Sequence, residues 1–414
     1  MDWFKDLQWR GLVNAITNEE KLVKFMQNKK AAYVGFDPSA ASLHLGNYIM
    51  IMMVRRLNLA GVKTYAVVGG ATGMIGDPSG KSNERNLLDE QTVLNNKAKI
   101  VAQLRKYATS DILDNYDHFK NMNYLTFLRD IGKFVNINYL LEKEIIKKRL
   151  ETTGLSYTEF SYNLIQSYDF FKFYKDLDVH MQIGGSDQWG NITAGIELIR
   201  KMLGDDNNAV GMTMNLLTNS EGKKFGKSEK GAIYLDKSMT SPYEMYQFLL
   251  NQTDNDVIKL LKVFTLLSKE EIELIEKQHL SSPASRIAQN ALANWVVSDI
   301  HGQDELDNVI EISQKLFKGE IASLKANDLK NALSNVPNIE VMENEYNIVD
   351  FLVINNIAKS RTQARELITS NAIAINGKCI DNQEFVVKKS DAFDQEFTVT
   401  KKGKKSYYLT QWKH

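Results

Sequence analysis

Two short polar segments, far apart in the chain, carry residue types suited to binding phosphate. The first, residues 44–47, reads His-Leu-Gly-Asn, and its two polar side chains stand three positions apart, so both can face one ligand at a helix start. Free N–H groups and partial positive charge favour an anion there. The second, residues 224–228, reads Lys-Phe-Gly-Lys-Ser. Its glycine lets a loop close, and its lysines can meet charge as pyrophosphate leaves. Taken singly, a capped helix start and a solvated lysine-rich turn are commoner explanations.

A glycine-rich segment over residues 73–82 invites comparison with a P-loop. That motif requires four residues between its first glycine and the Gly-Lys-Ser triplet. Here Gly76 leaves only three, and the required position holds Ile75. The P-loop interpretation is therefore rejected, and Lys81 and Arg85 remain as cations near the ends of predicted strands.

A polar stripe runs along one predicted helix. Tyr162, Gln166 and Asp169 stand at i, i+4 and i+7, so they share one helix face. Such a stripe usually faces solvent, but the surrounding residues of 160–173 are strongly apolar and include several phenylalanines. A buried polar face needs partners, and a bound polar ligand can supply them. The stripe alone leaves the solvated and the ligand-binding interpretations equally favoured.

The elements that must position these groups read as an α/β sheet. Residues 31–36 form a short apolar run, a helix is predicted from His44 to a glycine stop at Gly61, and residues 64–68 form the next strand. Strand, helix and strand at this spacing predict a parallel sheet with helices on its faces. Residues 181–185 read as a later strand of that sheet. Polar residues that follow these strands should converge, because ligands bind beyond the carboxyl ends of such strands.

The second half of the chain changes character. Residues 241–319 show helical periodicity with few glycines, residues 320–345 are polar and weakly patterned like a linker, and residues from 347 onward predict two short helices and several strands. Residues 356–414 hold 11 Lys or Arg against 6 Asp or Glu. We therefore expect a basic C-terminal module.

Bulk composition sets the outer limits. With 414 residues, two or three domains are expected, and 51 basic residues balance 51 acidic ones. The balance argues against a protein that coats nucleic acid indiscriminately. A single cysteine, Cys379, excludes internal disulfides and cysteine-rich zinc sites. No signal peptide or membrane-spanning run is recognised, so a soluble cytoplasmic protein is expected.

Taken together, the segments are similar to the bacterial tyrosyl-tRNA synthetases, a family of class I aminoacyl-tRNA synthetases, over essentially the whole chain. The matching segments are residues 33–39, 44–47, 69–73, 76–81, 158–162, 166–170, 182–191 and 224–228. Residues 360–365 and 375–377 resemble an RNA-binding module shared with a small-subunit ribosomal protein. The long contiguous matches make the resemblance specific.

The resemblance implies a role for each site residue. Tyr33 and Asp169 would hold the tyrosine phenol, and Asp77, Tyr162 and Gln166 its ammonium group, with Gln188 lining the same site. The ATP-binding set would be Gly35, Asp37, Gly46, Gly185, Asp187 and Lys227. The groups that meet the phosphates and the departing pyrophosphate would be Ser39, His44, Asn47, Lys81, Arg85, Lys224, Lys227 and Ser228. Arg361 and Arg365 would contact tRNA.

The same resemblance implies the domains and partners. A Rossmann-like catalytic domain would span residues 1–222, a mobile signature loop 223–235, an α-helical anticodon-binding domain 236–319, a linker 320–345, and a small α+β RNA-binding domain 346–414. The substrates would be L-tyrosine, ATP with Mg²⁺ and tyrosine tRNA, with no tightly bound cofactor and no metal held by the protein. A homodimer without membrane contact is expected.

Two departures from the family pattern stand out. Asn47 replaces the usual second histidine of the first signature, and Phe225-Gly226 replaces methionine and serine in the second. An asparagine amide can still donate a hydrogen bond at similar reach. Three alternatives stay open: a synthetase for tryptophan, a small-metabolite nucleotidyltransferase, and a non-catalytic RNA-binding protein on a decayed synthetase scaffold.

Overall fold

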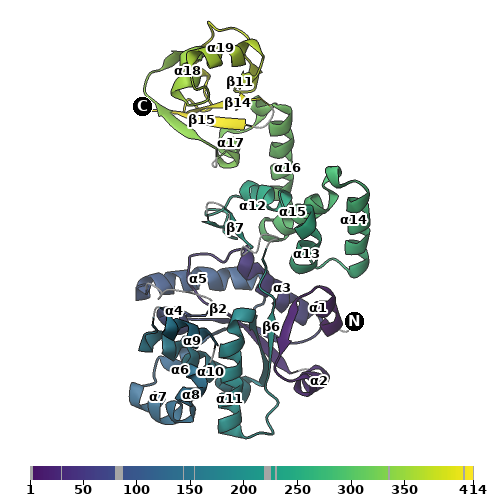
Figure 1. Cartoon of the computed structure of the whole chain (residues 1–414), viewed down its shortest axis with the longest axis vertical. Helices are drawn as coiled ribbons and strands as arrows, with labels where there is room; N and C mark the ends of the chain where they lie inside the picture. The colour runs from purple at the N-terminus through teal and green to yellow at the C-terminus, as the bar shows by residue number, and fades with distance from the viewer. Residues whose placement is uncertain are drawn as a thin grey trace. The chain divides into compact units, whose positions relative to one another are not determined.

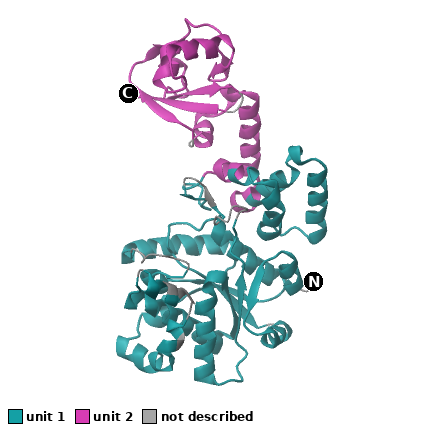
Figure 2. Cartoon of the chain, viewed as in Figure 1, with its two compact units in different colours: residues 1–240, 248–296 teal, residues 241–247, 297–414 magenta. Residues whose placement is uncertain are grey.

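The computed structural model describes residues 3–28, 30–79, 87–142, 144–152, 154–218, 225–228, 231–333, 336–403 and 406–413. The chain divides into two compact units, unit 1 with Met1–Thr240 and Phe248–Val296 and unit 2 with Ser241–Gln247 and Val297–His414 (Figure 2). This division differs from the domain bounds expected from the sequence, which stay a prediction.

Unit 1 contains the predicted parallel sheet. Its six strands lie in the order β1-β6-β5-β2-β3-β4. Their bounds are β1 (Val13–Ile16), β2 (Ala31–Phe36), β3 (Thr64–Val68), β4 (Ile112–Asp114), β5 (Val179–Gly185) and β6 (Val210–Met214). All neighbouring pairs are parallel except that β1 pairs antiparallel with β6 at one edge. From β2 the chain builds outward through β3 and β4 and later returns to β5 on the other side, so the strand order reverses between β2 and β5. Open α/β sheets bind ligands at such a reversal.

Helices cover both faces of this sheet, with α3 and α5 on one side and α10 and α11 on the other (Figure 1). The helices up to residue 203 are α1 (Trp3–Trp9), α2 (Glu19–Asn28), α3 (Leu45–Leu59), α4 (Thr72–Ile75), α5 (Glu90–Tyr107), α6 (Tyr116–Phe119), α7 (Tyr124–Asp130), η1 (Gly132–Phe134), α8 (Ile137–Leu141), α9 (Glu144–Glu151), α10 (Tyr157–Leu177), η2 (Ser186–Gln188) and α11 (Trp189–Leu203). Coverage on both faces explains why the strands read as continuous apolar runs; all five residues of β6 are buried.

The following segment is helical, as predicted. It holds two short antiparallel strands, β7 (Lys227–Ser228) and β8 (Gly231–Ala232), then α12 (Pro242–Leu250), α13 (Asp254–Phe264), α14 (Lys269–Ser281), η3 (Pro283–Ser285), α15 (Ile287–His301) and α16 (Gln303–Lys318). Among the described residues, none of the helices is both long and apolar enough to span a membrane.

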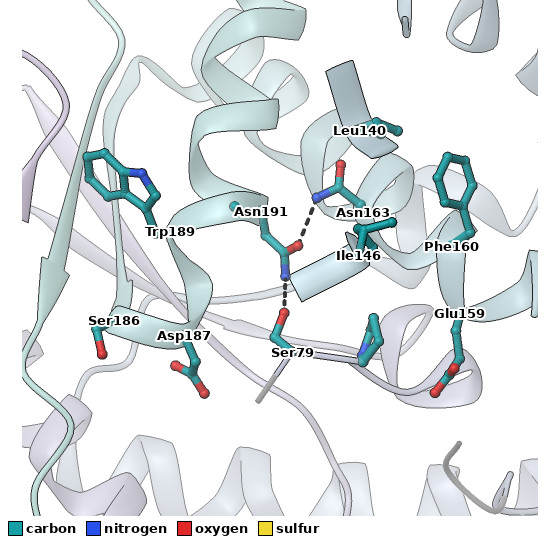
Figure 3. Close-up of a pocket in the computed structure, with 12 residues that line it drawn as sticks. Ser79, Leu140, Ile146, Glu159, Phe160, Asn163, Ser186, Asp187, Trp189 and Asn191 are labelled. Atoms are coloured by element: carbon teal, nitrogen blue, oxygen red, sulfur yellow. Dashed lines mark hydrogen bonds between the residues drawn. The ribbon is translucent and has the colours of Figure 1, made fainter. Parts of the chain in front are cut away.

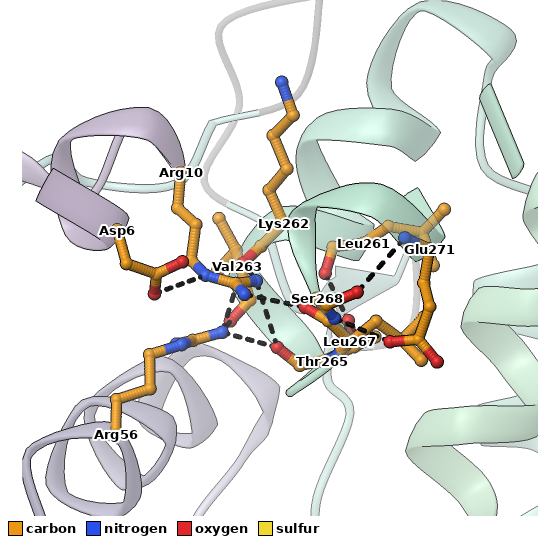
Figure 4. Close-up of polar contacts among 10 residues, drawn as sticks. All are labelled: Asp6, Arg10, Arg56, Leu261, Lys262, Val263, Thr265, Leu267, Ser268 and Glu271. Atoms are coloured by element: carbon orange, nitrogen blue, oxygen red, sulfur yellow. Dashed lines mark hydrogen bonds and ion pairs between the residues drawn. The ribbon is translucent and has the colours of Figure 1, made fainter. Parts of the chain in front are cut away.

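Two buried arginines, Arg10 just after α1 and Arg56 on α3, bind the end of α13 within unit 1 (Figure 4). The Nη2 group of Arg56 donates to the carbonyl oxygens of Val263 at 2.9 Å and Thr265 at 2.7 Å, and Nη2 of Arg10 donates to that of Leu267 at 2.7 Å. The last carbonyls of a helix carry partial negative charge, so they attract cations. Burial, and then the neighbouring Arg10, lower the pKa of Arg56 to about 9.

The same end of α13 also carries an aromatic contact to both predicted signatures. Tyr48 of α3 stacks on Phe264 with ring centroids 6.0 Å apart, and Phe225 packs against Phe264 at 5.3 Å. Phe264 is fully buried. A residue of α13 therefore packs between the helix that follows the first signature and the loop that carries the second.

Unit 2 ends in a five-stranded sheet of order β12-β11-β14-β15-β9. Its elements are η4 (Ile321–Ser323), α17 (Ala326–Ala332), β9 (Asn338–Val341), β10 (Glu345–Asn347), α18 (Ile348–Ile354), α19 (Arg361–Thr369), β11 (Ile373–Ile375), β12 (Lys378–Cys379), β13 (Val386–Lys388), η5 (Lys389–Asp391), β14 (Phe397–Lys402) and β15 (Ser406–Trp412). The predicted helix pair over residues 349–370 and the strand over residues 372–375 correspond to α18, α19 and β11.

Most of the described residues in 320–345, the segment expected to be a linker, belong to folded elements. Leu329 and Leu333 pack in one core with Phe397 and Leu409 of the C-terminal sheet, and β9 pairs in parallel with β15. These elements were hard to predict because the helix α17 has seven residues and the strand β9 has four, too few to show clear periodicity in the sequence.

Candidate active site

The carboxyl ends of four neighbouring strands bring polar side chains together. Asp37 follows β2, Thr72 lies just beyond β3, Asn115 follows β4, and Gln188 lies just beyond β5. Asp37 accepts hydrogen bonds from the hydroxyl of Thr72 at 2.7 Å and from that of Tyr162 at 2.8 Å. Polar groups beyond neighbouring strands therefore meet at this edge of the sheet, and Asp37 is the predicted residue among those that the two bonds join.

Tyr33 and Asp169 are both buried in this region. Tyr33 lies on β2 and Asp169 on α10, and their exposed fractions are 2% and 3%. Phe170 and Phe173 pack edge-on against the Tyr33 ring at 5.6 and 5.3 Å. Among the described residues, neither the Tyr33 hydroxyl nor Oδ1 of Asp169 has a hydrogen-bond partner. Buried polar atoms of this kind are costly unless something else pairs with them.

Burial also sets the protonation of this pair. Desolvation raises the pKa of the Asp169 carboxyl well above its ordinary 3.8, with Asp37 and Asp114 acting in the same direction and the hydrogen bond from Asn115 opposing them. Desolvation, and then Asp169, raise the pKa of the Tyr33 phenol well above 10.0. Both shifts therefore disfavour the charged forms of the two groups.

Tyr162 and Asp169 of the polar stripe on α10 are buried, which argues against the solvated interpretation; ligand binding by the stripe stays a prediction. Tyr162 contacts Asp37, and the side-chain nitrogen of Gln166 donates to Oε1 of Gln188 at 3.3 Å. Gln188 in turn donates to Oδ2 of Asp77 at 2.6 Å. Oε1 of Gln166 is buried without a partner in the described part of the chain. Of the residues expected to bind an ammonium group, Asp77 and Gln166 are thus joined through Gln188, whereas Tyr162 bonds Asp37.

Sequence reasoning missed Asn115 and Thr72. Asn115 is 1% exposed, and its amide nitrogen donates to Oδ2 of Asp169 at 2.9 Å and to the hydroxyl of Thr72 at 3.1 Å. Its amide oxygen accepts from the N–H of Ala71 at 2.8 Å. Asn115 therefore fixes one carboxylate oxygen of Asp169 and leaves the other for a ligand. Its position directly after a strand was a usable signal, but β4 has only three residues.

The first signature begins α3 with reciprocal hydrogen bonds. His44 is the N-cap, the N–H of Asn47 donates to its Nδ1 at 3.3 Å, and the N–H of His44 donates to Oδ1 of Asn47 at 3.1 Å. The capping interpretation is therefore confirmed, and it explains how asparagine fits at position 47. Oδ1 of Asn47 accepts at the cap, and the amide Nδ2 is the donor of this side chain.

The second signature lies against the first. The N–H of Leu45 donates to the carbonyl of Ile233 at 2.9 Å, and the N–H of Ile233 donates to that of Gly226 at 2.9 Å. Gly226 has φ of +85°, and a Cβ there would lie 3.0 Å from the N atom of Gly46. Only glycine fits such a backbone at such a separation without strain. Two segments about 180 residues apart in sequence thus meet at two glycines.

For several predicted site residues the position or the side chain lies outside the described part of the structure. Lys81, Arg85 and Lys224 fall outside the described residues, and only the backbone of Lys227 and Ser228 is described, as β7. No group of three or more metal-binding side chains is found among the described residues.

The glycine and serine positions assigned to ATP are described. Gly35 on β2 has open space where a Cβ would stand, whereas a Cβ on Gly185 would meet Oδ1 of Asp187 at 2.6 Å. Ser39 and Asp37 line a cavity of about 100 Å³. These groups border the strand ends of β2 and β5, where a nucleotide is expected.

The two arginines expected to contact RNA lie on α19 in unit 2. Both are exposed. Nε of Arg361 bonds Oδ1 of Asp350 at 2.7 Å, and Arg365 lines a surface hollow with Glu366. Their exposure agrees with a surface role, and their contact with tRNA stays a prediction.

Comparison with known proteins identifies the family. A family model described as "tRNA synthetases class I (W and Y)" matches residues 26–318, and one described as "Tyrosine--tRNA ligase SYY-like C-terminal domain" matches residues 328–410. A tyrosine–tRNA ligase of Ureaplasma urealyticum is 57% identical over 408 residues, which cover 99% of this chain and 98% of that protein. A tyrosine–tRNA ligase of Streptococcus uberis is 46% identical over 98% of this chain and 99% of its own length.

A solved structure agrees with the sequence relatives. The C-terminally truncated mitochondrial tyrosyl-tRNA synthetase of Aspergillus nidulans superposes with a TM-score of 0.68 at 30% identity, and the match covers 76% of this chain and 94% of that one. The parallel sheet described above agrees with these matches. The chain belongs to the tyrosine–tRNA ligases, the tyrosyl-tRNA synthetases of class I.

Proposed function

We propose that this chain recognises L-tyrosine through Tyr33 and Asp169, activates it with ATP to tyrosyl-adenylate, and transfers it to the terminal adenosine of tyrosine tRNA. The observation that carries the residue assignment is the pair of buried oxygens, the Tyr33 hydroxyl and Oδ1 of Asp169, without hydrogen-bond partners among the described residues. A phenolic O–H between them would donate to one and accept from the other.

The amino end of tyrosine would meet the network on α10. Asp77 supplies a carboxylate, Tyr162 a hydroxyl, and Gln166 the buried Oε1 that still needs a donor. An ammonium group has three donors and no acceptor, which suits this oxygen-rich set. Gln188 bridges Asp77 and Gln166 and would hold both in place.

Adenylate formation needs positioning more than acid–base catalysis. The tyrosine carboxylate is ionised at neutral pH, so one of its oxygens can attack the α-phosphorus while the bond to the β-phosphate oxygen breaks and pyrophosphate leaves with Mg²⁺. The residues proposed to bind ATP and to neutralise this charge are Gly35, Asp37, Ser39, His44, Gly46, Asn47, Lys81, Arg85, Gly185, Asp187, Lys224, Lys227 and Ser228. The packing of Gly226 on Gly46 supports a site assembled from both signatures.

Selectivity for tyrosine follows from the same oxygens. Phenylalanine would leave the Tyr33 hydroxyl and Asp169 unpaired beside its ring, and a buried polar group left unpaired is the strongest way to reject such an analogue. Tyrosyl-tRNA synthetases are the established example of this effect, with a discrimination of about 10⁵ that is known for the enzyme class and does not follow from the geometry of this chain. Exchange of labelled pyrophosphate into ATP should require tyrosine. Equal exchange with tryptophan or phenylalanine would refute the assignment.

The basic C-terminal module would bind tRNA mainly through phosphates. Replacing Arg361 and Arg365 together by alanine should weaken tRNA charging while leaving pyrophosphate exchange unchanged. Lys330→Ala is the matched control, because Lys330 is another exposed cation of unit 2 and is paired with Glu396 at 3.0 Å. A parallel loss of both activities in the double variant would contradict the tRNA assignment. On this proposal residues 1–222 carry out tyrosine activation, and residues 346–414 bind RNA.

An apolar surface on unit 1 fits the expected homodimer. Leu125 is 75% exposed, Ile137 61% and Tyr157 59%, and these residues lie on α7, on α8 and at the start of α10. The hydroxyls of Tyr124 and Tyr157 are 3.3 Å apart, so α7 and α10 are neighbours. Patches of this kind on otherwise soluble proteins mark association surfaces. We place the dimer interface there, in an enzyme of the cytoplasm.

Leu125→Glu tests the interface. A charge in the apolar face should halve the mass measured by sedimentation equilibrium, whereas Leu59→Glu, at another exposed leucine (75%) on α3, should leave it unchanged. A wild-type monomer would refute the homodimer, and a dimeric Leu125→Glu protein would refute this location.

A further inference from the structure

Figure 3 shows a second cavity in unit 1, whose lining includes Asp187 of the proposed ATP-binding set. It measures about 140 Å³, and its apolar walls come from Leu140, Ile146, Phe160 and Trp189. In Figure 3 the rings of Trp189 and Phe160 stand on opposite sides of Asn191. Trp189 is 37% exposed, so part of its side chain is accessible. A cavity of this size has room for a ring system.

The floor of the cavity is polar and joined to the tyrosine site. The amide nitrogen of Asn191 donates to Oγ of Ser79 at 3.3 Å and to Oε1 of Gln188 at 3.1 Å. Gln188 continues the chain to Asp77 at 2.6 Å. A group in the cavity would therefore sit one hydrogen-bonded residue away from the amino-acid site.

One acceptor in the cavity wall still needs a donor. The amide nitrogen of Asn163 donates to Oδ1 of Asn191 at 2.8 Å. Asn163 is 8% exposed, and its Oδ1 is buried without a hydrogen-bond partner among the described residues. A ligand for this cavity should thus have flat apolar faces and an N–H donor on its edge. A nucleobase with an exocyclic amino group has both.

We infer that this cavity holds the base of the terminal adenosine of tRNA during the transfer step, with the base on Trp189 and its amino group donating to Asn163. The inference rests on the proposed function, which requires a second nucleoside beside the adenylate. The ribose then stays outside the cavity. Its hydroxyl oxygen forms the ester bond to the tyrosyl carbonyl carbon, the bond from that carbon to the phosphate oxygen breaks, and the hydroxyl proton is passed to the departing AMP.

Replacement of Trp189 separates this step from activation. Trp189→Ala should slow single-turnover transfer from preformed tyrosyl-adenylate roughly tenfold or more, since stacking a base on an aromatic ring typically contributes that much. Trp189→Phe should retain most of the rate because it keeps an aromatic face. Pyrophosphate exchange should change by less than about twofold in both variants, because stacking in the transfer step does not enter it. Leu203→Ala is the control, an exposed residue at the far end of the same helix α11.

The outcomes distinguish the possible occupants. An unchanged transfer rate in Trp189→Ala would overturn the inference, and so would a raised KM for ATP in pyrophosphate exchange, which would place the base of ATP in the cavity instead. A tRNA that ends in inosine, with an oxygen in place of the amino group, should be charged roughly tenfold more slowly than one that ends in adenosine. Equal charging would also overturn the inference. Absence of tyrosine-dependent exchange in the wild type would instead refute the proposed function itself.

Discussion

Tyr33→Phe should weaken tyrosine activation without weakening the fold. The Tyr33 hydroxyl is buried and has no hydrogen bond within the described residues, so its removal breaks no contact that stabilises the free protein. An unpaired buried hydroxyl destabilises the folded state by roughly 1–3 kcal/mol. Removing the Tyr33 hydroxyl should therefore leave the thermal stability of the protein equal or higher. In the complex the same hydroxyl would bond the substrate phenol. A net hydrogen bond contributes about 0.5–1.5 kcal/mol, which predicts a roughly 2- to 12-fold loss in kcat/KM for tyrosine.

Pyrophosphate exchange and differential scanning calorimetry measure the two effects separately. The selectivity for tyrosine over phenylalanine should fall by the same factor, because phenylalanine makes no bond to lose. Tyr174→Phe is the matched control: the Tyr174 hydroxyl accepts from the N–H of Asn208 at 3.0 Å, so this variant should lose stability and keep its activity. A less stable Tyr33→Phe protein with unchanged kcat/KM would refute the reasoning.

Two further changes test the buried charges. Burial raises the pKa of Asp169 well above 3.8 in the folded protein, so the neutral carboxyl stabilises the fold at low pH and that contribution is lost as pH rises toward the folded pKa. The melting temperature of Asp169→Asn should thus exceed that of the wild type by a margin that widens as pH rises above about 4. A margin that stays constant with pH would contradict a raised pKa for Asp169. Arg56→Ala removes a charged donor to the carbonyls of Val263 and Thr265 and should cost roughly 2–3 kcal/mol in urea unfolding, with little recovery in Arg56→Lys, since an ammonium cannot reproduce the planar fork. A change below about 0.5 kcal/mol would show that Arg10 alone holds the end of α13.

The strands and the polar stripe were predictable because their signals are local. The run at β2 matched its prediction residue for residue, since a strand covered by helices on both faces must be apolar throughout. The spacing of Tyr162, Gln166 and Asp169 specified one face of α10, but only the fold shows that this face is buried. Periodicity gives the direction of a side chain relative to its helix, and burial depends on what packs against that helix.

Other parts of the site were beyond local reasoning. Asn115 matters because it bonds Asp169, 54 positions further along the chain, and no spacing rule relates the two. The packing of Gly226 on Gly46 and of Phe225 on Phe264 likewise depends on the tertiary fold. The buried ion pair of Arg149 and Glu159 at 2.7 Å was not foreseen either, because charged residues on short amphipathic segments read as solvated.

The antiparallel strand at the sheet edge has a consequence for biosynthesis. Val13 of β1 pairs with Met214 of β6, so the first strand to leave the ribosome waits for about two hundred further residues before its partner exists. Until then the growing chain carries an unpaired strand, and β5 stands as an open edge. Premature termination before β6 would leave both exposed to aggregation and to proteolysis. Translation that stalls in this interval should therefore yield fragments that are cleared rather than partially active enzyme.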